Sequence, residues 1–480
     1  MRLPANITNH ALAVLLEHSG FGSYERFAEA VNVRAHRRYG IVTGYDQLSV
    51  KRWLRGARCQ YPEVVADVLS AAWGISVPPD VLWPATRSGD RPSPAFLQPW
   101  VSSRTLANLA RLVRSDMLTR RHTLAQAVAV AAGATLVEPI SHWLRARPVG
   151  LSSVAGAGVA GAADETAGRI GMAEVAGIEQ ATRHFVTQDA NLGGGLAREA
   201  AVGQLKYAVD LLRHGSFSQP VGDRLLAAVA ELAGLVGWMS HDSGMPGPGQ
   251  RYLVYGVQAA RESGDERATL LAVANLADLA RQMRDLHRPG TGLRLIDQAL
   301  GLLPNGRRYP ATRAMVWNLR GRMLAGMGVS HHREADSALK LAFDLGADAD
   351  ETEVVPAGAY TGEAELAANA GGSFLALARE DPRFATVAAD HSTRALTLRG
   401  DGFARSNAFN QIELARARFL MGEVDQGCDD GETALELAGR VTASVRMRDR
   451  LAELWVDSTA HQEVPRVRGL RTRLPHPATA

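Results

Sequence analysis

Positive charge is concentrated between residues 26 and 58 of this 480-residue chain, where eight Lys or Arg residues stand against the acids Glu29 and Asp46. Cations in a short segment can neutralise phosphates, and nearby polar side chains can read base edges in a major groove. The pattern therefore predicts a surface that binds double-stranded DNA. We expect Gln47, Ser49 and Arg52 near base edges, and Arg37, Arg38, Lys51, Arg55 and Arg58 on phosphates. The alternative is a surface helical hairpin whose basic face meets only solvent.

Two helices joined by a turn would position these side chains. Ser23 and Asp46 are good N-caps, Gly40 and Gly44 mark the turn, and Gly56 ends the second helix. The expected apolar positions are Phe27, Ala30, Val31 and Val33 in the first helix, and Leu48, Val50, Trp53 and Leu54 in the second.

The charge of the whole chain is only +3, so the basic signal is local. Residues 1–121 hold 16 basic and 9 acidic residues, a balance of +7, which leaves −4 for the rest. Cys59 and Cys428, the two cysteines, have no metal-ligand spacing, which favours a reducing cytoplasm without disulfide or zinc. The start has no long apolar core behind a basic tip, so we expect no signal peptide.

Four regions are expected along the chain. They are a DNA-binding domain over 1–88, a helical connector with a Gly/Ala-rich linker over 89–171, a repeat domain over 172–460 and a flexible basic tail over 461–480. Residues 119–140 imitate a twin-arginine leader, but their internal position favours a buried connecting helix. The glycines at 193–195 lack the other residues of a phosphate loop, so a helix break is expected there.

Small residues recur at fixed offsets beyond residue 225, where closely packed helix pairs need them. The matching sets are Gly237, Gly249 and Gly256; Ala280, Gly292 and Ala299; and Ala415, Gly427 and Ala434. Gly321 fits the first helix of another unit, although the turn that follows is about two residues too long for the ideal repeat. The pattern predicts a tetratricopeptide-like α-solenoid. The alternative is an irregular alanine-rich helical domain.

A ligand-binding groove follows from the register of these repeats. Residues predicted to line its concave wall are Trp238, His241, Arg281, Arg284, Asn318, Arg322, Arg416 and Phe419. Arginine matches carboxylates and asparagine can pair with peptide backbone, so a small acidic ligand or peptide is one interpretation. The equal alternative is that the arginines pair internally with Asp242, Asp285 or other acids.

Four stretches carry a resemblance to a known family: SVKRWLRG, ATRHFVTQDANLGGGLAREA, GWMSHDSGMPGPGQRYL and GEAELAANAGG. The chain resembles actinobacterial regulators with an N-terminal, phage-repressor-like helix-turn-helix and a C-terminal tetratricopeptide-like domain. It departs from the short phage-repressor pattern because VRAHRRYG extends the first motif helix. The resemblance implies a transcriptional regulator, often of development or antibiotic production, with a logic similar to that of regulators whose repeats bind a peptide signal.

The expected protein is thus all-α: a helix-turn-helix domain, a helical connector and a tetratricopeptide-like α-solenoid. We expect a cytoplasmic DNA-binding regulator without cofactor or metal and without membrane association. We expect it to be a homodimer, because paired half-sites strengthen the binding of such modules. No catalytic constellation is present in the sequence, which argues against an enzyme. The rival hypothesis is a helical-repeat scaffold that binds other proteins and has no specific affinity for DNA.

Overall fold

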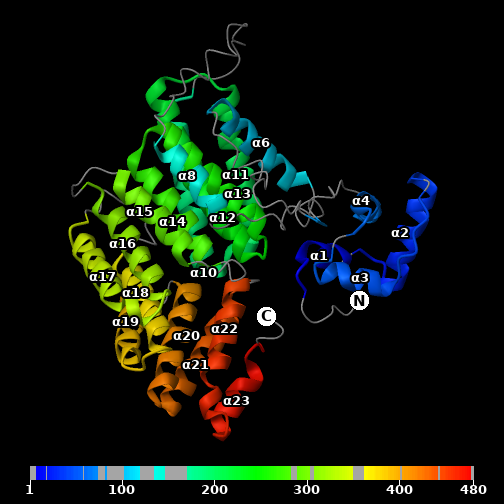
Figure 1. Ribbon diagram of the computed structural model, residues 1–480. Coiled ribbons are helices and arrows are strands. Elements are labelled where there is room, and N and C mark those ends of the chain that lie inside the picture. The colour runs from blue at the N-terminus through cyan, green and yellow to red at the C-terminus, as the bar shows by residue number, and fades with distance from the viewer. Residues whose placement is uncertain are drawn as a thin grey trace. The chain divides into compact units, whose positions relative to one another are not determined.

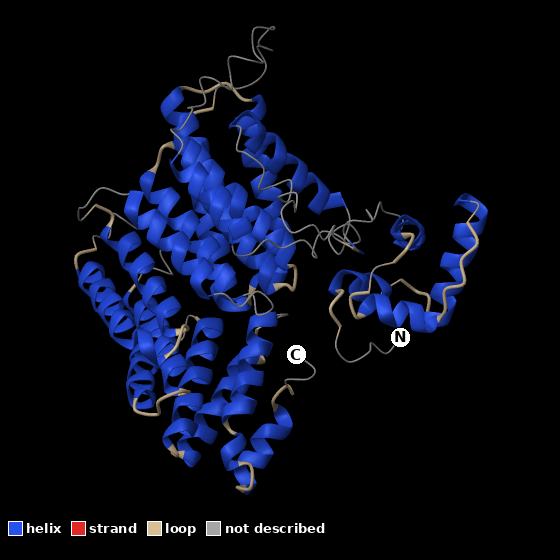
Figure 2. Cartoon of the chain, in the orientation of Figure 1, coloured by secondary structure: helices blue, strands red, loops and turns tan. Residues whose placement is uncertain are grey.

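The computed structural model describes residues 7–17, 19–39, 41–57, 59–73, 82–83, 102–118, 134–145, 170–282, 289–302, 308–349, 362–400, 403–441 and 444–476. Helices account for the regular structure in this part of the chain, which contains no strand (Figure 2). The predicted all-α, solenoid-like class is therefore confirmed. The chain divides into two compact units: residues 1–95 with 114–130, and residues 96–113 with 131–480.

The first unit contains α1 (His10–Glu17), α2 (Tyr24–Tyr39), α3 (Gln47–Leu54) and α4 (Pro62–Trp73). Its core is built around Phe27 and Val31 of α2, Trp53 and Leu54 of α3, and apolar residues of α1 and α4. Two predicted core residues are wrong: Val33 is 43% and Leu48 54% exposed. Helical periodicity marks an apolar stripe, but it does not say how much of that stripe a neighbouring helix covers.

Asn32 fixes the connection between α2 and α3. Its Nδ2 donates to the carbonyl oxygen of Tyr45 at 2.8 Å, and its Oδ1 accepts from Thr43 Oγ1 at 2.8 Å and from the backbone N–H of Tyr45 at 3.0 Å. The ring of Tyr45 in turn meets Trp53 edge-on, with centroids 4.7 Å apart. The amide of the half-buried Asn32 thus sets where α3 begins.

In the second unit, helices are arranged in two rows (Figure 1). Each helix of the inner row contacts the next inner helix, and an outer helix follows each inner one along the chain. The inner row is α10 (Met172–Leu192), α12 (Gln219–Asp242), α14 (Glu266–Gln282), α16 (Pro310–Ala325), α18 (Glu363–Ala378), α20 (Ala404–Met421) and α22 (Val445–Asp457). The outer row is α11 (Gly194–His214), α13 (Pro246–Ser263), α15 (Pro289–Leu302), α17 (His332–Ala347), α19 (Phe384–Arg399), α21 (Val424–Ala438) and α23 (Pro465–Arg473).

The inner row curves back on itself, because α20 contacts α10 and α22 contacts α12. The solenoid therefore closes into a ring. The connector contributes two helices. In α6 (Ser102–Leu118), Thr105 bonds Gln258 of α13 within the second unit, and α8 (Ala134–Arg145) packs against α13 and α15. Apart from residues 170 and 171, the other connector and linker residues lie outside the described residues, including 119–133 of the leader-like segment, as do 477–480 of the predicted tail.

Small residues lie where paired helices approach most closely, as the sequence predicted. A Cβ on Gly249 of α13 would lie 2.8 Å from the carbonyl oxygen of Gly237 in α12. Gly193, with φ 84°, separates α10 from α11, which confirms the predicted helix break. The long turn after Gly328 contains a 3₁₀ turn, Val329–His331, that accommodates its extra residues. None of the described helices combines the length and apolar character needed to cross a lipid bilayer.

We predict opposite effects for two glycine-to-alanine changes. Gly249→Ala should lower the free energy of unfolding by about 1 to 3 kcal/mol, because the new methyl group would meet backbone of α12. Gly203→Ala, in the interior of α11 with no neighbour within 4 Å, should raise it by about 0.5 to 1 kcal/mol. Urea denaturation measures both. Equal effects would contradict the assigned contact between α12 and α13.

Candidate nucleic-acid interface and repeat-domain cavity

Helix α3 presents a polar face to solvent because Val50, Trp53 and Leu54 are buried on the opposite side. Gln47, Arg52 and Arg55 are exposed, as is Arg37 on α2, whereas Ser49 and Lys51 are half-buried. The side chain of Arg38 and the whole of Arg58 lie outside the described residues. The structure thus gathers several predicted contact residues on α3 and its surroundings.

Unpaired cations distinguish this face. Arg37, Arg52 and Arg55 form no ion pair with any residue that the structure describes. Arg34 differs, because its guanidinium lies 3.2 Å from the carboxylate of Asp67 and so joins α2 to α4. Cations without a protein partner keep their charge available for phosphates.

Ser49 has a structural partner of its own. Its backbone N–H donates to Asp46 Oδ1 at 2.8 Å and its hydroxyl oxygen accepts from the backbone N–H of Asp46 at 3.4 Å, and these two bonds form a capping box at the start of α3. The hydroxyl also donates to Asp46 Oδ1 at 2.8 Å. These bonds hold the pKa of Asp46 below its usual value. A base contact by Ser49 would therefore have to coexist with its capping role, whereas Gln47 and Arg52 carry no such commitment among the described residues.

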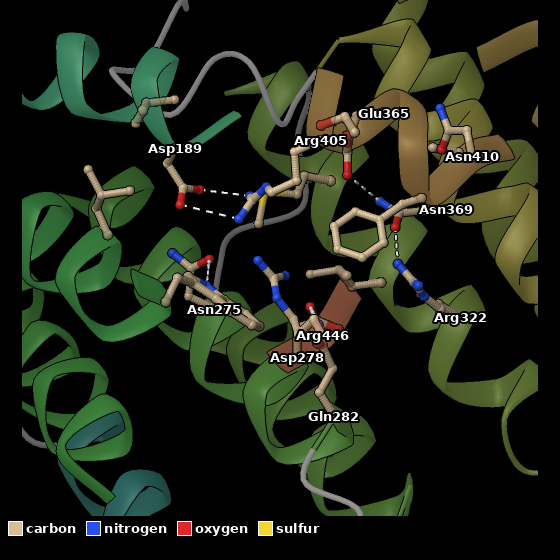
Figure 3. A pocket seen from close by; sticks show the side chains of 18 of the residues that line it. Asp189, Asn275, Asp278, Gln282, Arg322, Glu365, Asn369, Arg405, Asn410 and Arg446 are labelled. Carbon is tan, nitrogen blue, oxygen red and sulfur yellow. Dashed lines mark hydrogen bonds and ion pairs between the residues drawn. The ribbon is translucent and has the colours of Figure 1, made fainter. Parts of the chain in front are cut away.

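The second unit contains a partly open cavity of about 190 Å³ among its inner helices (Figure 3). Residues of every inner helix contribute to its wall. Of the predicted groove residues, only Trp238 and Arg322 line it. Indole Nε1 of Trp238 donates to Asn275 Oδ1 at 3.1 Å, and Arg322 bonds to Asn369.

The other predicted groove residues have structural surroundings. Arg281 lies 2.7 Å from Asp278, and Arg416 lies 2.6 Å from Glu453 and 2.7 Å from Asp457. Asn318 and Phe419 are buried, and Arg284 lies outside the described residues. His241 is half-buried, and burial together with Arg446 lowers its pKa to about 4. The described groove arginines thus pair internally, as the alternative interpretation proposed, but with acids other than Asp242.

A buried ion cluster joins the two ends of the ring. Arg405 of α20 lies 2.8 Å from Asp189 of α10 and 3.0 Å from Asp242 at the end of α12. Arg446 of α22 lies 3.0 Å from the same Asp242, which also accepts a bond from the hydroxyl of Ser444 at 2.7 Å. Burial alone would raise the pKa of Asp242, but Arg446, Arg405 and Ser444 hold it below its usual range.

Sequence reasoning missed this cluster, although Asp242 was named as a possible partner of the groove arginines. Arg405 and Asp189 are 216 positions apart. No periodic pattern connects residues at such a separation, and only the closure of the ring reveals it.

We predict that Asp242→Asn destabilises the repeat domain by about 3 to 5 kcal/mol at pH 7, because Arg405 and Arg446 lose a buried counter-charge. The lowered pKa contributes stability above about pH 4, and that contribution is lost as the pH falls through the folded-state value. The difference in the free energy of unfolding between the wild-type protein and the Asp242→Asn variant should therefore become smaller at acid pH. Asp344→Asn, at an exposed position of α17, should change stability by less than about 0.5 kcal/mol. Equal denaturation midpoints for both variants would contradict the role of Asp242.

Glu231 of α12 gives a second, opposite pH dependence. Burial raises the pKa of Glu231 to about 7, against the effect of Arg267, whose guanidinium lies 3.0 Å away. An acid with a raised folded-state pKa contributes stability at low pH, and this is lost as the pH rises from about 4.5 through 7.

Glu231→Gln should remove this loss of stability at rising pH. The wild-type free energy of unfolding should fall, relative to that of the variant, by roughly 2 to 3 kcal/mol between pH 4.5 and 8.5. Comparison of the two proteins cancels groups that titrate in both. Parallel curves over this range would show that Glu231 titrates normally.

Comparison with known proteins identifies one similar family. Residues 12–82 match the SP15 N-terminal domain, a span that runs from α1 to just beyond α4. This is a small part of the chain. No curated protein and no solved structure matched it.

Proposed function

We propose that this protein is a DNA-binding transcriptional regulator whose repeat domain senses a small molecule. The observation that carries the proposal is the exposed face of α3, where Gln47, Arg52 and Arg55 are presented by a helix that is capped at Asp46 and fixed on its other side by a packed core. Affinity for phosphates and hydrogen bonds to base edges both require side chains of this kind on a rigid element.

The treatment of charge in the two units supports the proposal. In the repeat domain, most arginines of the inner helices are paired with carboxylates, and Arg405, Arg416 and Arg446 are examples. Arg37, Arg52 and Arg55 of the first unit have no such described partner. Cations left unpaired on one face are consistent with an external polyanion.

The remaining parts of the proposal follow from the same logic. A homodimer would place two copies of α3 on paired half-sites, because a single module of this size binds weakly. Buried, unpaired Cys59 and Cys428 are compatible with a reducing cytoplasm. A scaffold that binds only protein partners is the alternative, and DNA binding separates the two.

We expect the full-length protein to bind fragments of its own upstream DNA, with an affinity that falls as salt rises. Arg52→Ala should weaken specific binding by about 1 to 3 kcal/mol, whereas Arg55→Ala should weaken all sequences alike and reduce the salt slope by about one. Fluorescence anisotropy at several salt concentrations measures both effects.

The charge-matched control is Arg333→Ala, at an exposed position of α17 in the repeat domain, which should leave binding unchanged. Failure of the wild-type protein to bind any duplex at low salt would refute the regulator and favour the scaffold. Equal losses from Arg52→Ala and Arg333→Ala would refute the assignment of α3 as the reading helix.

A further inference from the structure

The charges that line the cavity of the ring are balanced. Its wall contains five arginines, Arg322, Arg399, Arg405, Arg446 and Arg450, and five acids, Asp189, Glu231, Asp278, Glu365 and Glu413. These groups come from every helix of the inner row and from α19.

Each of these charges also has an opposite charge close by. Arg405 pairs with Asp189, and Arg399 with Glu365. Four of the lining charges pair with residues that do not line the cavity themselves. These pairs are Arg446 with Asp242, Arg450 with Glu453, Asp278 with Arg281, and Glu231 with Arg267. Arg322 bonds to Asn369 and lies 3.9 Å from Glu413. A ligand that carried a net charge into this cavity would leave that charge, or the partner it displaced, uncompensated in a buried place.

Most of the rest of the wall is apolar or amide-bearing, with the hydroxyl-bearing Thr182 and Ser406 in addition. Aliphatic surface comes from Leu235, Leu271, Met315 and Leu319, and aromatic surface from Trp238 and Phe409. The amide-bearing residues are Asn275, Gln282, Asn369 and Asn410. Such a surface favours a ligand with an apolar body.

Asn410 supplies a polar handle. It is only 2% exposed, and its Nδ2 is buried without a hydrogen-bond partner among the described residues. A buried donor without an acceptor costs about 1 to 3 kcal/mol. The side chain of Asn410 belongs to the cavity wall, so a rotation of this side chain would bring the amide to the carbonyl oxygen of a ligand.

The volume limits the ligand. A cavity of about 150 Å³ accepts benzene in a well-studied protein, and this one measures about 190 Å³. A compact molecule on the order of ten non-hydrogen atoms fits that space.

From these observations we infer that the cavity is a binding site for a small uncharged molecule with an apolar body and a carbonyl-type acceptor. The inference deepens the proposed function, since it names the class of signal that the repeat domain would sense. It replaces the acidic ligand or peptide expected from the sequence, because the arginines that suggested an acid are already paired.

The test uses the full-length protein without DNA. Uncharged amides, esters and ketones of about ten non-hydrogen atoms are compared with the carboxylate and ammonium analogues of the same chain length, by saturation-transfer NMR and by competition. We expect uncharged compounds to bind at least tenfold more tightly than either analogue. Equal or tighter binding of the carboxylates would overturn the inference in favour of an acidic ligand, and no binding by any uncharged compound would overturn it outright.

Three variants locate the binding. Ala368→Leu fills the cavity from α18 and should abolish binding, whereas Ala376→Leu, on the same helix but outside the cavity wall, should not. Asn410→Leu should weaken binding about tenfold and raise the melting temperature of the free protein, because it removes an unpaired buried donor. Binding that survives Ala368→Leu in a folded protein would place the ligand elsewhere.

The ligand-binding test and the DNA-binding test can fail independently of each other. If Arg52 proves necessary for DNA binding while no uncharged probe binds, the regulator stands and the ligand inference fails. If probes bind in the cavity but the protein ignores DNA, the ligand site stands and the regulator fails.

Discussion

The structure of the repeat domain depends on the buried carboxylate of Asp242. It lies at the end of α12 and accepts ion pairs from Arg405 on α20 and Arg446 on α22, so one side chain joins helices from opposite ends of the chain's repeat array. Removing three charges from water is costly, and the cost is offset only because the geometry is close and Ser444 adds a further hydrogen bond. An open solenoid would present a groove. With its ends joined in this way, the same row of inner helices surrounds a cavity.

Arginine has different roles in the two units, and in the repeat domain closure of the ring explains its role. Inside the ring, arginines lie opposite acids of neighbouring or distant repeats and act as structural links. In the first unit, Arg52 lies on α3 and Arg55 is the C-cap of that helix. The described acid nearest to Arg52 in sequence, Asp46, is occupied as the N-cap. The partner of an arginine, rather than its presence, decides whether it can serve an external ligand. This distinction requires the tertiary structure.

Local features were predictable from the sequence and long-range ones were not. The caps at Ser23 and Asp46, the helix break at Gly193 and the close approach at Gly237 follow from rules that involve a few neighbouring residues. Val33 and Leu48 were predicted to be buried and are exposed, because periodicity cannot reveal how far a partner helix extends. The groove residues were predicted from the register of one repeat at a time. This prediction included Trp238 and Arg322, which line the cavity, but neither Asp189 nor Asn410, which reach the cavity only because the ring closes.

A molecule in this cavity would act through ring closure. Its wall includes residues of α10 and α12 at one end of the array and of α20 and α22 at the other. A ligand that contacts both ends binds the closed ring better than an open one, and only such a difference in affinity can shift the balance between the two states. At a concentration one hundred times its dissociation constant, a ligand specific for the closed ring would stabilise that state by about 2.7 kcal/mol. This approaches the cost of breaking one buried ion pair, about 3 to 5 kcal/mol. The strength of the cluster around Asp242 therefore determines whether a bound molecule can alter the ring.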